Sequence, residues 1–473
     1  MNFSIKIKFL MTCLALLVCQ LAEARHFTVK QKNEVTVSGY AERLNDGDTI
    51  VLNLYKFGEF AQHPLSKTTF TTVASHRRFH ISFPVSARAR YVDLILPAGT
   101  GCYFAGYLVT AGDQVNISMK QQQVFFTGQG SACWKVKFKS DSLQKVFFRE
   151  QKGIPTLESK TRLINALTQA RLATLKADSI RLPPVIYHIL KADILGEEML
   201  LAYNYTKTFY QNGGTSRPAA FNQSVKYAEE AIGESAVYAN DFIAGQIARY
   251  KLDSCIIPDQ PFSLPKAYAF FKTGTGFSKS LKEKLITYLL FMERTSKEIV
   301  PLLADASAFV TGGDMAKVLE ELSTSVMPGA RAYDFSLPDT AGKLVHSGDF
   351  KDKVVLMDFW FTGCGACLKI KPELEKIEKL YQGKDVVFIS VGLDKSKTQW
   401  LSSVRQNKYS TRQSKNLFTE SQAFNHPIAR HYNITGCPTL ILVDRNGNIL
   451  RIPESPLDDG GNGLVNAINE TLR

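Results

Sequence analysis

Two cysteines, Cys364 and Cys367, are separated by only two small residues. They stand between an apolar run typical of a β-strand, Lys353 to Trp360, and a segment with helical periodicity, Cys367 to Tyr381. Free backbone N–H groups and the helix dipole at such a position favour a thiolate at the first cysteine. A lowered pKa makes that thiol both a nucleophile and a leaving group. The spacing predicts thiol–disulfide exchange, with the deeper Cys367 attacking second.

The same spacing has two other interpretations, half of a zinc site and a purely structural disulfide. No second Cys-x-x-Cys and no His-x-x-x-His follows, which disfavours structural zinc. Three residues favour redox chemistry instead. Asp358 lies within the apolar strand, where a carboxylate is costly, Pro372 lies within the predicted helix, and Pro438 precedes another strand at a position suited to a cis peptide bond.

The first 24 residues have the pattern of a secretory signal peptide. Lys6 and Lys8 precede the short apolar run Phe9 to Val18, and Ala22 to Ala24 forms a small-x-small cleavage site. The apolar run is shorter than a membrane span. We therefore expect an exported, soluble mature protein, and Val18 disfavours lipidation at Cys19.

The chain has eight cysteines, and removal of the signal peptide, which contains Cys13 and Cys19, leaves six. An exported protein can form disulfides, but six cysteines in so long a chain do not make a disulfide scaffold. Pairing of Cys102 with Cys133 stays open, and Cys255 is expected to be buried. The formal net charge is +13, and the basic residues are scattered along the chain. This pattern predicts a solvated basic surface and no nucleic-acid partner.

The rest of the chain divides into three predicted domains. Residues 25–130 contain short β-branched and aromatic runs separated by turn sequences, which predicts a β-sandwich. Residues 131–326 have apolar residues at spacings of three and four, which predicts a helical domain. Residues 327–473 alternate strands and helices and end in a hairpin around Asn446-Gly447, which predicts an α/β fold.

At this point the sequence resembles a known family. Asp358-Phe-Trp ahead of the cysteine pair, the helix proline, and Gly436-Cys-Pro-Thr439 before a hairpin are together similar to the thioredoxin signature. Phe335 to Lys343, and Ser390 to Asp394 with Trp400 nearby, resemble the exported TlpA/ResA branch. The resemblance covers residues 328–473 and implies a thioredoxin fold there. The front half is loosely similar to the N-terminal part of two-part TlpA-like proteins.

The resemblance implies a role for each matching residue. Cys364 is the attacking thiol, Cys367 the resolving thiol, and Asp358 the buried acid/base that takes the proton from Cys367. Pro438 is the cis proline that holds the substrate backbone in an extended pose. The residues expected to border the substrate are Trp360, Gly363, Gly365, Ala366 and Cys437. No metal and no cofactor other than the redox-active disulfide is expected.

Three positions depart from the family pattern. Gly363 replaces the usual Trp, which removes an apolar shield from Cys364. Ala366 replaces the usual Pro and frees a backbone N–H near the thiolate, which predicts a more oxidising pair. Cys437 directly precedes Pro438 and is either a small packing residue or a third thiol for alternative disulfides or a soft metal.

Taken together, these features predict an exported thiol:disulfide oxidoreductase, periplasmic or in the cell envelope. The resemblance to the TlpA/ResA branch implies that it reduces or exchanges disulfides of client proteins and is recharged by an upstream membrane electron donor of the DsbD/CcdA kind. The alternatives are a disulfide isomerase and a non-enzymatic metallochaperone or binding protein that uses Cys364, Cys367 and Cys437. We expect packing or surface roles for His426 and His431. The oligomeric state stays undetermined.

Overall fold

The computed structural model describes residues 33–56, 66–85, 89–121, 123–150, 156–211, 233–294, 296, 298–434, 436–451, 453, 455–457 and 459–472. The predicted signal peptide, residues 1–24 with Cys19, lies outside these residues. The chain packs into two compact units, Met1–Ala61 with Leu65–Gln260, and Gln62–Pro64 with Pro261–Arg473. The boundary after Gln260 lies inside the region that we predicted as one helical domain.

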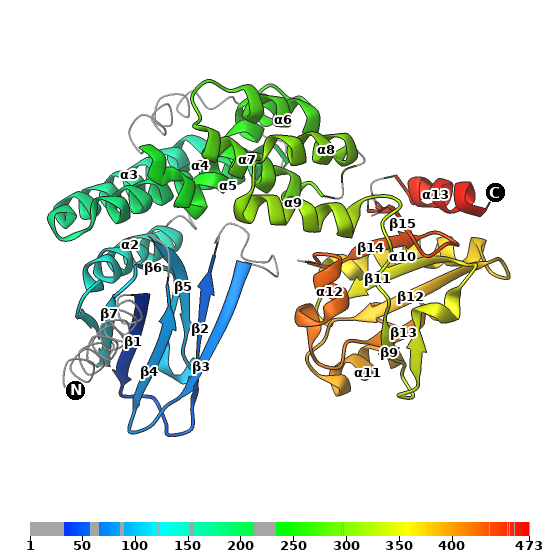
Figure 1. The fold of residues 1–473 in the computed structure, drawn as a ribbon, viewed down its shortest axis with the longest axis horizontal. Helices are drawn as coiled ribbons and strands as arrows, with labels where there is room; N and C mark the ends of the chain where they lie inside the picture. The colour runs from blue at the N-terminus through cyan, green and yellow to red at the C-terminus, as the bar shows by residue number, and fades with distance from the viewer. Residues whose placement is uncertain are drawn as a thin grey trace, which may run out of the picture. The chain divides into compact units, whose positions relative to one another are not determined.

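The described residues of the first unit begin with a series of β-strands, most of which are labelled in Figure 1. They are β1 (Glu34–Ala41), β2 (Thr49–Tyr55), β3 (Lys67–Val73), β4 (Arg78–Pro84), β5 (Arg90–Ile95), β6 (Tyr103–Val109), β7 (Gln114–Lys120) and β8 (Gln123–Thr127). They form two four-stranded sheets, in the orders β4-β1-β7-β8 and β3-β2-β5-β6. Aromatic rings join the sheets, because Phe70 lies 5.4 Å from Phe83 and Phe104 lies 5.9 Å from Phe126.

The strand-rich character of this region is as predicted, but the sequence pattern did not reveal every strand. β6 is interrupted by Gly106, whose φ of +66° is left-handed and whose N–H donates to Asp93 Oδ1 at 2.8 Å. The pairing of β5 with β6 shifts register at this point. A glycine at such an irregularity breaks the alternation that identifies a strand from sequence.

Among the described residues, four α-helices complete the first unit. They are α2 (Ser131–Glu150), α3 (Leu157–Ala177), α4 (Pro184–Gln211) and α5 (Asn240–Lys251). Trp134 of α2 is fully buried and packs on Tyr107 of β6 with ring centroids 4.7 Å apart. Tyr91 of β5 donates to Asp193 of α4 at 2.5 Å. These contacts join the strands and helices into one body.

The second unit opens with four more helices, which pack among themselves. They are α6 (Leu264–Thr273), α7 (Lys279–Met292), α8 (Ile299–Phe309) and α9 (Gly313–Val326). Ser263 and Ser278 cap α6 and α7 with their hydroxyls, as serine at an N-cap commonly does. None of the helices among the described residues is both long and apolar enough to cross a membrane.

The C-terminal part has the predicted order of alternating strands and helices. Its elements are β9 (Ser336–Pro338), β10 (Leu344–His346), β11 (Val354–Trp360), α10 (Gly365–Leu380), β12 (Val386–Gly392), α11 (Lys397–Arg405), β13 (Lys415–Phe418), α12 (Pro427–His431), β14 (Thr439–Val443), β15 (Ile449–Arg451) and α13 (Asn462–Leu472). Five strands form one sheet in the order β13-β12-β11-β14-β15. β11 and β12 run parallel, and β14 is antiparallel to both of its neighbours.

The central strand β11 is buried along its whole length, which explains its continuous apolar sequence. Val354 and Leu356 point to the face of the sheet that packs against α10 and α13, where they share a core with Leu374 and Ile468. Side chains alternate along a strand, so Asp358 points to this same face. The sheet therefore places Asp358 on the side covered by the helix that carries Cys367.

Candidate redox site

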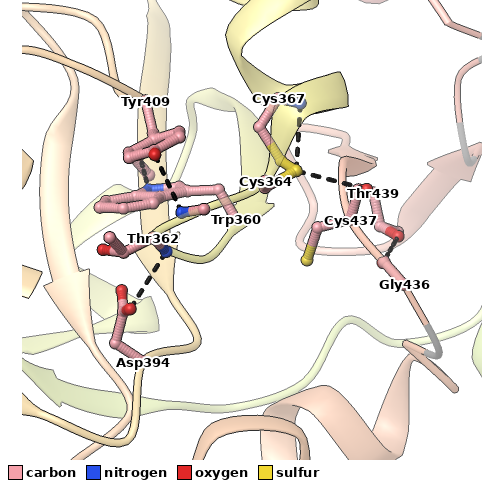
Figure 2. Close-up of a disulfide and its surroundings, with 11 residues drawn as sticks. Trp360, Thr362, Cys364, Cys367, Asp394, Tyr409, Gly436, Cys437 and Thr439 are labelled. Carbon is pink, nitrogen blue, oxygen red and sulfur yellow. Dashed lines mark hydrogen bonds between the residues drawn. A yellow bond between two sulfur atoms is a disulfide. The ribbon is translucent and has the colours of Figure 1, made fainter.

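Cys364 and Cys367 form a disulfide, with their Cα atoms 5.3 Å apart. The helix α10 begins at Gly365, two residues earlier than the sequence pattern indicated, so Cys364 is the N-cap residue. The N–H of Cys367 donates to Cys364 Sγ at 3.1 Å (Figure 2). When the disulfide opens, this N–H is already in place to stabilise a thiolate at Cys364.

Both cysteine side chains are largely covered, and the order of their burial is the expected one. Cys364 is 4% exposed and Cys367 is 1% exposed. They pack with four buried aromatic residues, Trp360, Trp400, Tyr409 and Phe418. Cys364 is therefore the slightly more exposed of the two cysteines.

The loop before β14 borders the disulfide on the side opposite Trp360 (Figure 2). The Cys437–Pro438 peptide bond is cis, as predicted. The carbonyl oxygen of Cys437 lies 3.5 Å from Cys364 Sγ. This is a close contact and not a hydrogen bond in the oxidised form, because a disulfide sulfur has no proton. Thr439 Oγ1 donates to the Gly436 carbonyl at 2.8 Å and ties the two ends of the loop.

Asp358 lies in β11, on the face of the sheet that α10 covers. Its side chain is buried, and Oδ1 has no hydrogen-bond partner among the described residues. Burial raises the pKa of Asp358 to about 7, because the charged carboxylate loses its hydration. A group with this pKa can take and return a proton near neutral pH.

One residue between β11 and α10 has an unusual backbone conformation. Gly363 has a φ of +100°, which glycine adopts far more readily than any other residue. A side chain there would meet open space, so the constraint is the backbone and not crowding. Gly365 and Ala366, which we expected to border the substrate, are the first two residues of α10.

Aromatic side chains hold this region together. Trp360 stacks on Tyr409 with centroids 5.2 Å apart and donates from Nε1 to Ser390 Oγ at 2.6 Å. The hydroxyl of Tyr409 accepts the N–H of Gly363 at 2.9 Å. Tyr409 could not be identified from the sequence, because it lies in an irregular segment far along the chain from the cysteines and has no motif around it.

A second buried carboxylate lies near the pair. Asp394, two residues after the end of β12, accepts the N–H of Thr362 at 3.0 Å. Its Oδ2 has no hydrogen-bond partner among the described residues, and burial raises its pKa. Burial also raises the pKa of the Cys437 thiol well above its usual range, and the negative charges of Asp358 and Asp394 raise it further.

The other candidate histidines have packing contacts, and the other cysteines that the structure describes are free thiols. His426 is buried and accepts the N–H of Ile428 at the start of α12, and His431 packs edge-on against Tyr432. Cys102 and Cys133 are free thiols in the structure, and so are Cys255 and Cys437. No group of three His, Cys, Asp or Glu side chains among the described residues is arranged to hold a metal ion.

Known proteins match the part of the chain that carries the redox site. A family model described as thioredoxin-like matches residues 352–449. This chain carries a C-terminal thioredoxin-like domain. The match confirms the family that the sequence motifs indicated.

Curated relatives of the thioredoxin-like domain are named for the same chemistry. The thiol-disulfide oxidoreductase ResA of Geobacillus kaustophilus is 27% identical over 139 residues, which cover 27% of this chain and 70% of the relative. The thioredoxin-like protein YneN of Bacillus subtilis is 28% identical over 146 residues, covering 29% and 78%. The predicted enzyme class, a thioredoxin-like thiol-disulfide oxidoreductase, is confirmed by these relatives.

Two solved structures also resemble the thioredoxin-like domain. The thioredoxin domain of a thiol-disulfide oxidoreductase from Bacteroides vulgatus is 27% identical, with a TM-score of 0.28, and covers 32% of this chain and 100% of that chain. A thiol:disulfide interchange protein from Bacteroides sp. is 28% identical, with a TM-score of 0.27, and covers 31% and 91%.

Proposed function

We propose that this chain is an exported thiol:disulfide oxidoreductase that reduces or exchanges disulfides of envelope proteins through Cys364 and Cys367. The observation that supports this most directly is the Cys364 sulfur at the N-cap of α10, 3.1 Å from the N–H of Cys367. This geometry favours a thiolate at Cys364, the slightly more exposed cysteine of the pair. Export is proposed from the signal-peptide pattern of residues 1–24.

The reductive reaction would proceed in two exchange steps. The Cys364 thiolate attacks one sulfur of the client disulfide, forms a mixed disulfide, and releases the other client sulfur as a thiolate. Asp358 takes the proton of Cys367, whose thiolate then attacks Cys364 Sγ. The Cys364–Cys367 disulfide forms and the second client sulfur leaves. Two electrons pass from the pair to the client.

The cis-proline loop would hold the client during these steps. The carbonyl of Cys437 lies beside Cys364 Sγ, so a client chain running along this loop brings its sulfur to the attacking thiol. Pro438 leaves the loop backbone free of a donor at its own nitrogen. A membrane electron donor of the DsbD/CcdA kind would return the pair to its dithiol form.

Insulin reduction tests this proposal. The full chain, supplied with a thiol reductant, should precipitate the insulin B chain, and Cys364→Ser should lose that activity. Cys102→Ser is the matched control, because it removes a free thiol elsewhere in the chain. Equal turnover by the wild-type protein and Cys364→Ser would contradict the proposal.

The two alternatives make different predictions. A disulfide isomerase would restore activity to scrambled ribonuclease without a net supply of electrons. A metallochaperone would bind copper or zinc through Cys364, Cys367 and Cys437 after reduction. No observation among the described residues favours either one over the oxidoreductase.

A further inference from the structure

The turn that joins β11 to Cys364 is held by side chains from distant segments. The N–H of Gly363 donates to the Tyr409 hydroxyl at 2.9 Å. The N–H of Thr362 donates to Asp394 Oδ1 at 3.0 Å. The two backbone donors directly before the attacking cysteine are therefore both fixed by tertiary contacts (Figure 2).

The Tyr409 acceptor is itself held in place, and Thr362 has a second side-chain contact. The Tyr409 side chain is buried and its ring is stacked on Trp360. Trp360 is anchored in turn by its 2.6 Å hydrogen bond to Ser390. On the other side, the hydroxyl of Thr362 is hydrogen-bonded to Ser403 of α11 at 2.8 Å. Buried side chains with fixed partners can define the position of a backbone more closely than a solvent-exposed turn can.

We propose, on the basis of the proposed function, that Tyr409 and Asp394 are positioning residues that hold Cys364 Sγ in line with the N–H of Cys367. The 3.1 Å approach of that N–H to the sulfur depends on where the turn places Cys364. Hydrogen bonds weaken steeply when donor and acceptor move out of line. Loss of either anchor therefore reduces the stabilisation of the Cys364 thiolate.

Asp394 affects Cys364 in two opposite ways, which makes the proposal testable. As an acceptor it fixes the turn and favours the thiolate. As a negative charge close to the redox pair, together with Asp358, it disfavours a second negative charge at Cys364. We expect the direct hydrogen bond to the turn to outweigh the charge, so removing both should raise the pKa of Cys364, whereas removing the charge alone should not raise it.

The experiment measures alkylation of Cys364 in the reduced full-length protein. Iodoacetamide is added over a range of pH values, and the Cys364 peptide is quantified by mass spectrometry. The variants are Tyr409→Phe, which keeps the ring, Asp394→Ala, and Asp394→Asn, which keeps an acceptor oxygen. The controls are Tyr381→Phe, which loses a hydrogen-bonded hydroxyl at the other end of α10, and Asp385→Asn, an exposed carboxylate just before β12.

Tyr409→Phe and Asp394→Ala should raise the pKa of Cys364, so that alkylation at pH 7 slows about three- to tenfold, a tenfold change corresponding to about one pKa unit. Asp394→Asn should leave this pKa unchanged or lower it, and the controls should match the wild-type protein. Thermal unfolding of the same samples shows whether each variant is folded. Tyr409→Phe keeps its stacking and tests the proposal even if Asp394→Ala does not fold.

An unchanged alkylation profile in Tyr409→Phe, or a lowered pKa in Asp394→Ala, would overturn the positioning role. The outcome is separate from that of the proposed function, because alkylation needs no client. A wild-type protein that fails to reduce insulin would contradict the proposed function while the alkylation shifts still test the two positioning residues.

Discussion

The sulfur of Cys364 lies 3.5 Å from the carbonyl oxygen of Cys437, in the loop whose next peptide bond is cis. This contact places the backbone carbonyl of a third cysteine, Cys437, beside the redox pair. The Cys437 thiol itself has a pKa well above its usual range, because of burial and of the negative charges of Asp358 and Asp394. A thiol that stays protonated is a poor nucleophile.

We therefore expect Cys437 to act as a small packing residue during turnover. In the reduced protein, Cys437 should alkylate at least about tenfold more slowly than Cys364 at pH 8, measured by peptide mass spectrometry. Cys437→Ala should keep insulin reduction within about twofold of the wild-type rate, since it removes no reacting group. A disulfide between Cys437 and either redox cysteine during turnover would refute this expectation.

Asp358→Asn should slow the second exchange step, because amide nitrogen and oxygen cannot accept the proton of Cys367. General acid–base groups contribute about 10²–10⁴-fold, so we expect turnover to fall by about 10²-fold. In the wild-type protein the rate should also rise with pH around 7, where Asp358 loses its proton. Stopped-flow mixing with a disulfide substrate at several pH values measures both effects, and an unaltered pH profile in the variant would exclude this role.

The same carboxyl should affect stability with a predictable sign. Its pKa is raised to about 7 in the folded protein and is about 3.9 in an unfolded chain. The folded state binds more protons between these values, so stability falls as pH rises from about 4 to about 7. At about 1.4 kcal/mol per pKa unit, Asp358→Asn can gain up to about 4 kcal/mol at pH 8 and nothing from this source at pH 4.

Thermal unfolding of the oxidised protein at the two pH values checks this sign. Asp385→Asn is the matched control, because its carboxylate is exposed. A gain in melting temperature for Asp358→Asn that is equal at pH 4 and pH 8 would show that the carboxyl is not a source of pH-dependent instability.

Gly363→Ala should destabilise the protein by about 1–2 kcal/mol, because an L-residue at a φ of +100° is strained. It should also slow alkylation of Cys364, since the turn leads directly into that residue. Gly348→Ala is the control, because Gly348 has open space around it and no positive φ. Equal melting temperatures for the two variants would contradict this interpretation of Gly363.

Ala366→Pro tests whether the residue between the cysteines tunes the redox potential. Ala366 is the second residue of α10, where proline is tolerated but has no N–H to offer a thiolate. We expect the variant to have a lower reduction potential than the wild-type protein in a glutathione titration. A wild-type potential at or below about −270 mV, the value of thioredoxin, would contradict the predicted oxidising character.

The redox pair could be predicted from sequence because its chemistry is local. Cys364 and Cys367 share one turn of helix, and the strand before them is apolar at every position except Asp358. Asp358 was identifiable as a carboxylate within that strand, and Pro438 by the residues around it. Each of these signals lies within a few neighbouring residues.

The supporting contacts could not be predicted in the same way. Tyr409 lies between α11 and β13, in a segment with neither helical nor strand periodicity. Asp394 was noted only within a stretch similar to a known family, and its bond to Thr362 depends on how β12 lies beside β11. Gly363 was interpreted as a lost apolar shield, whereas its positive φ is a property of the folded backbone.

The central claim is that Cys364 attacks clients and Cys367 resolves the mixed disulfide. Its most direct test is trapping with Cys367→Ser in the full chain. We predict that this variant accumulates mixed disulfides on Cys364, visible as reductant-sensitive adducts, with Cys364→Ser as the matched control that forms none. Adducts on Cys364→Ser but not on Cys367→Ser would contradict the assigned order of attack, and adducts on neither would contradict the mixed-disulfide mechanism.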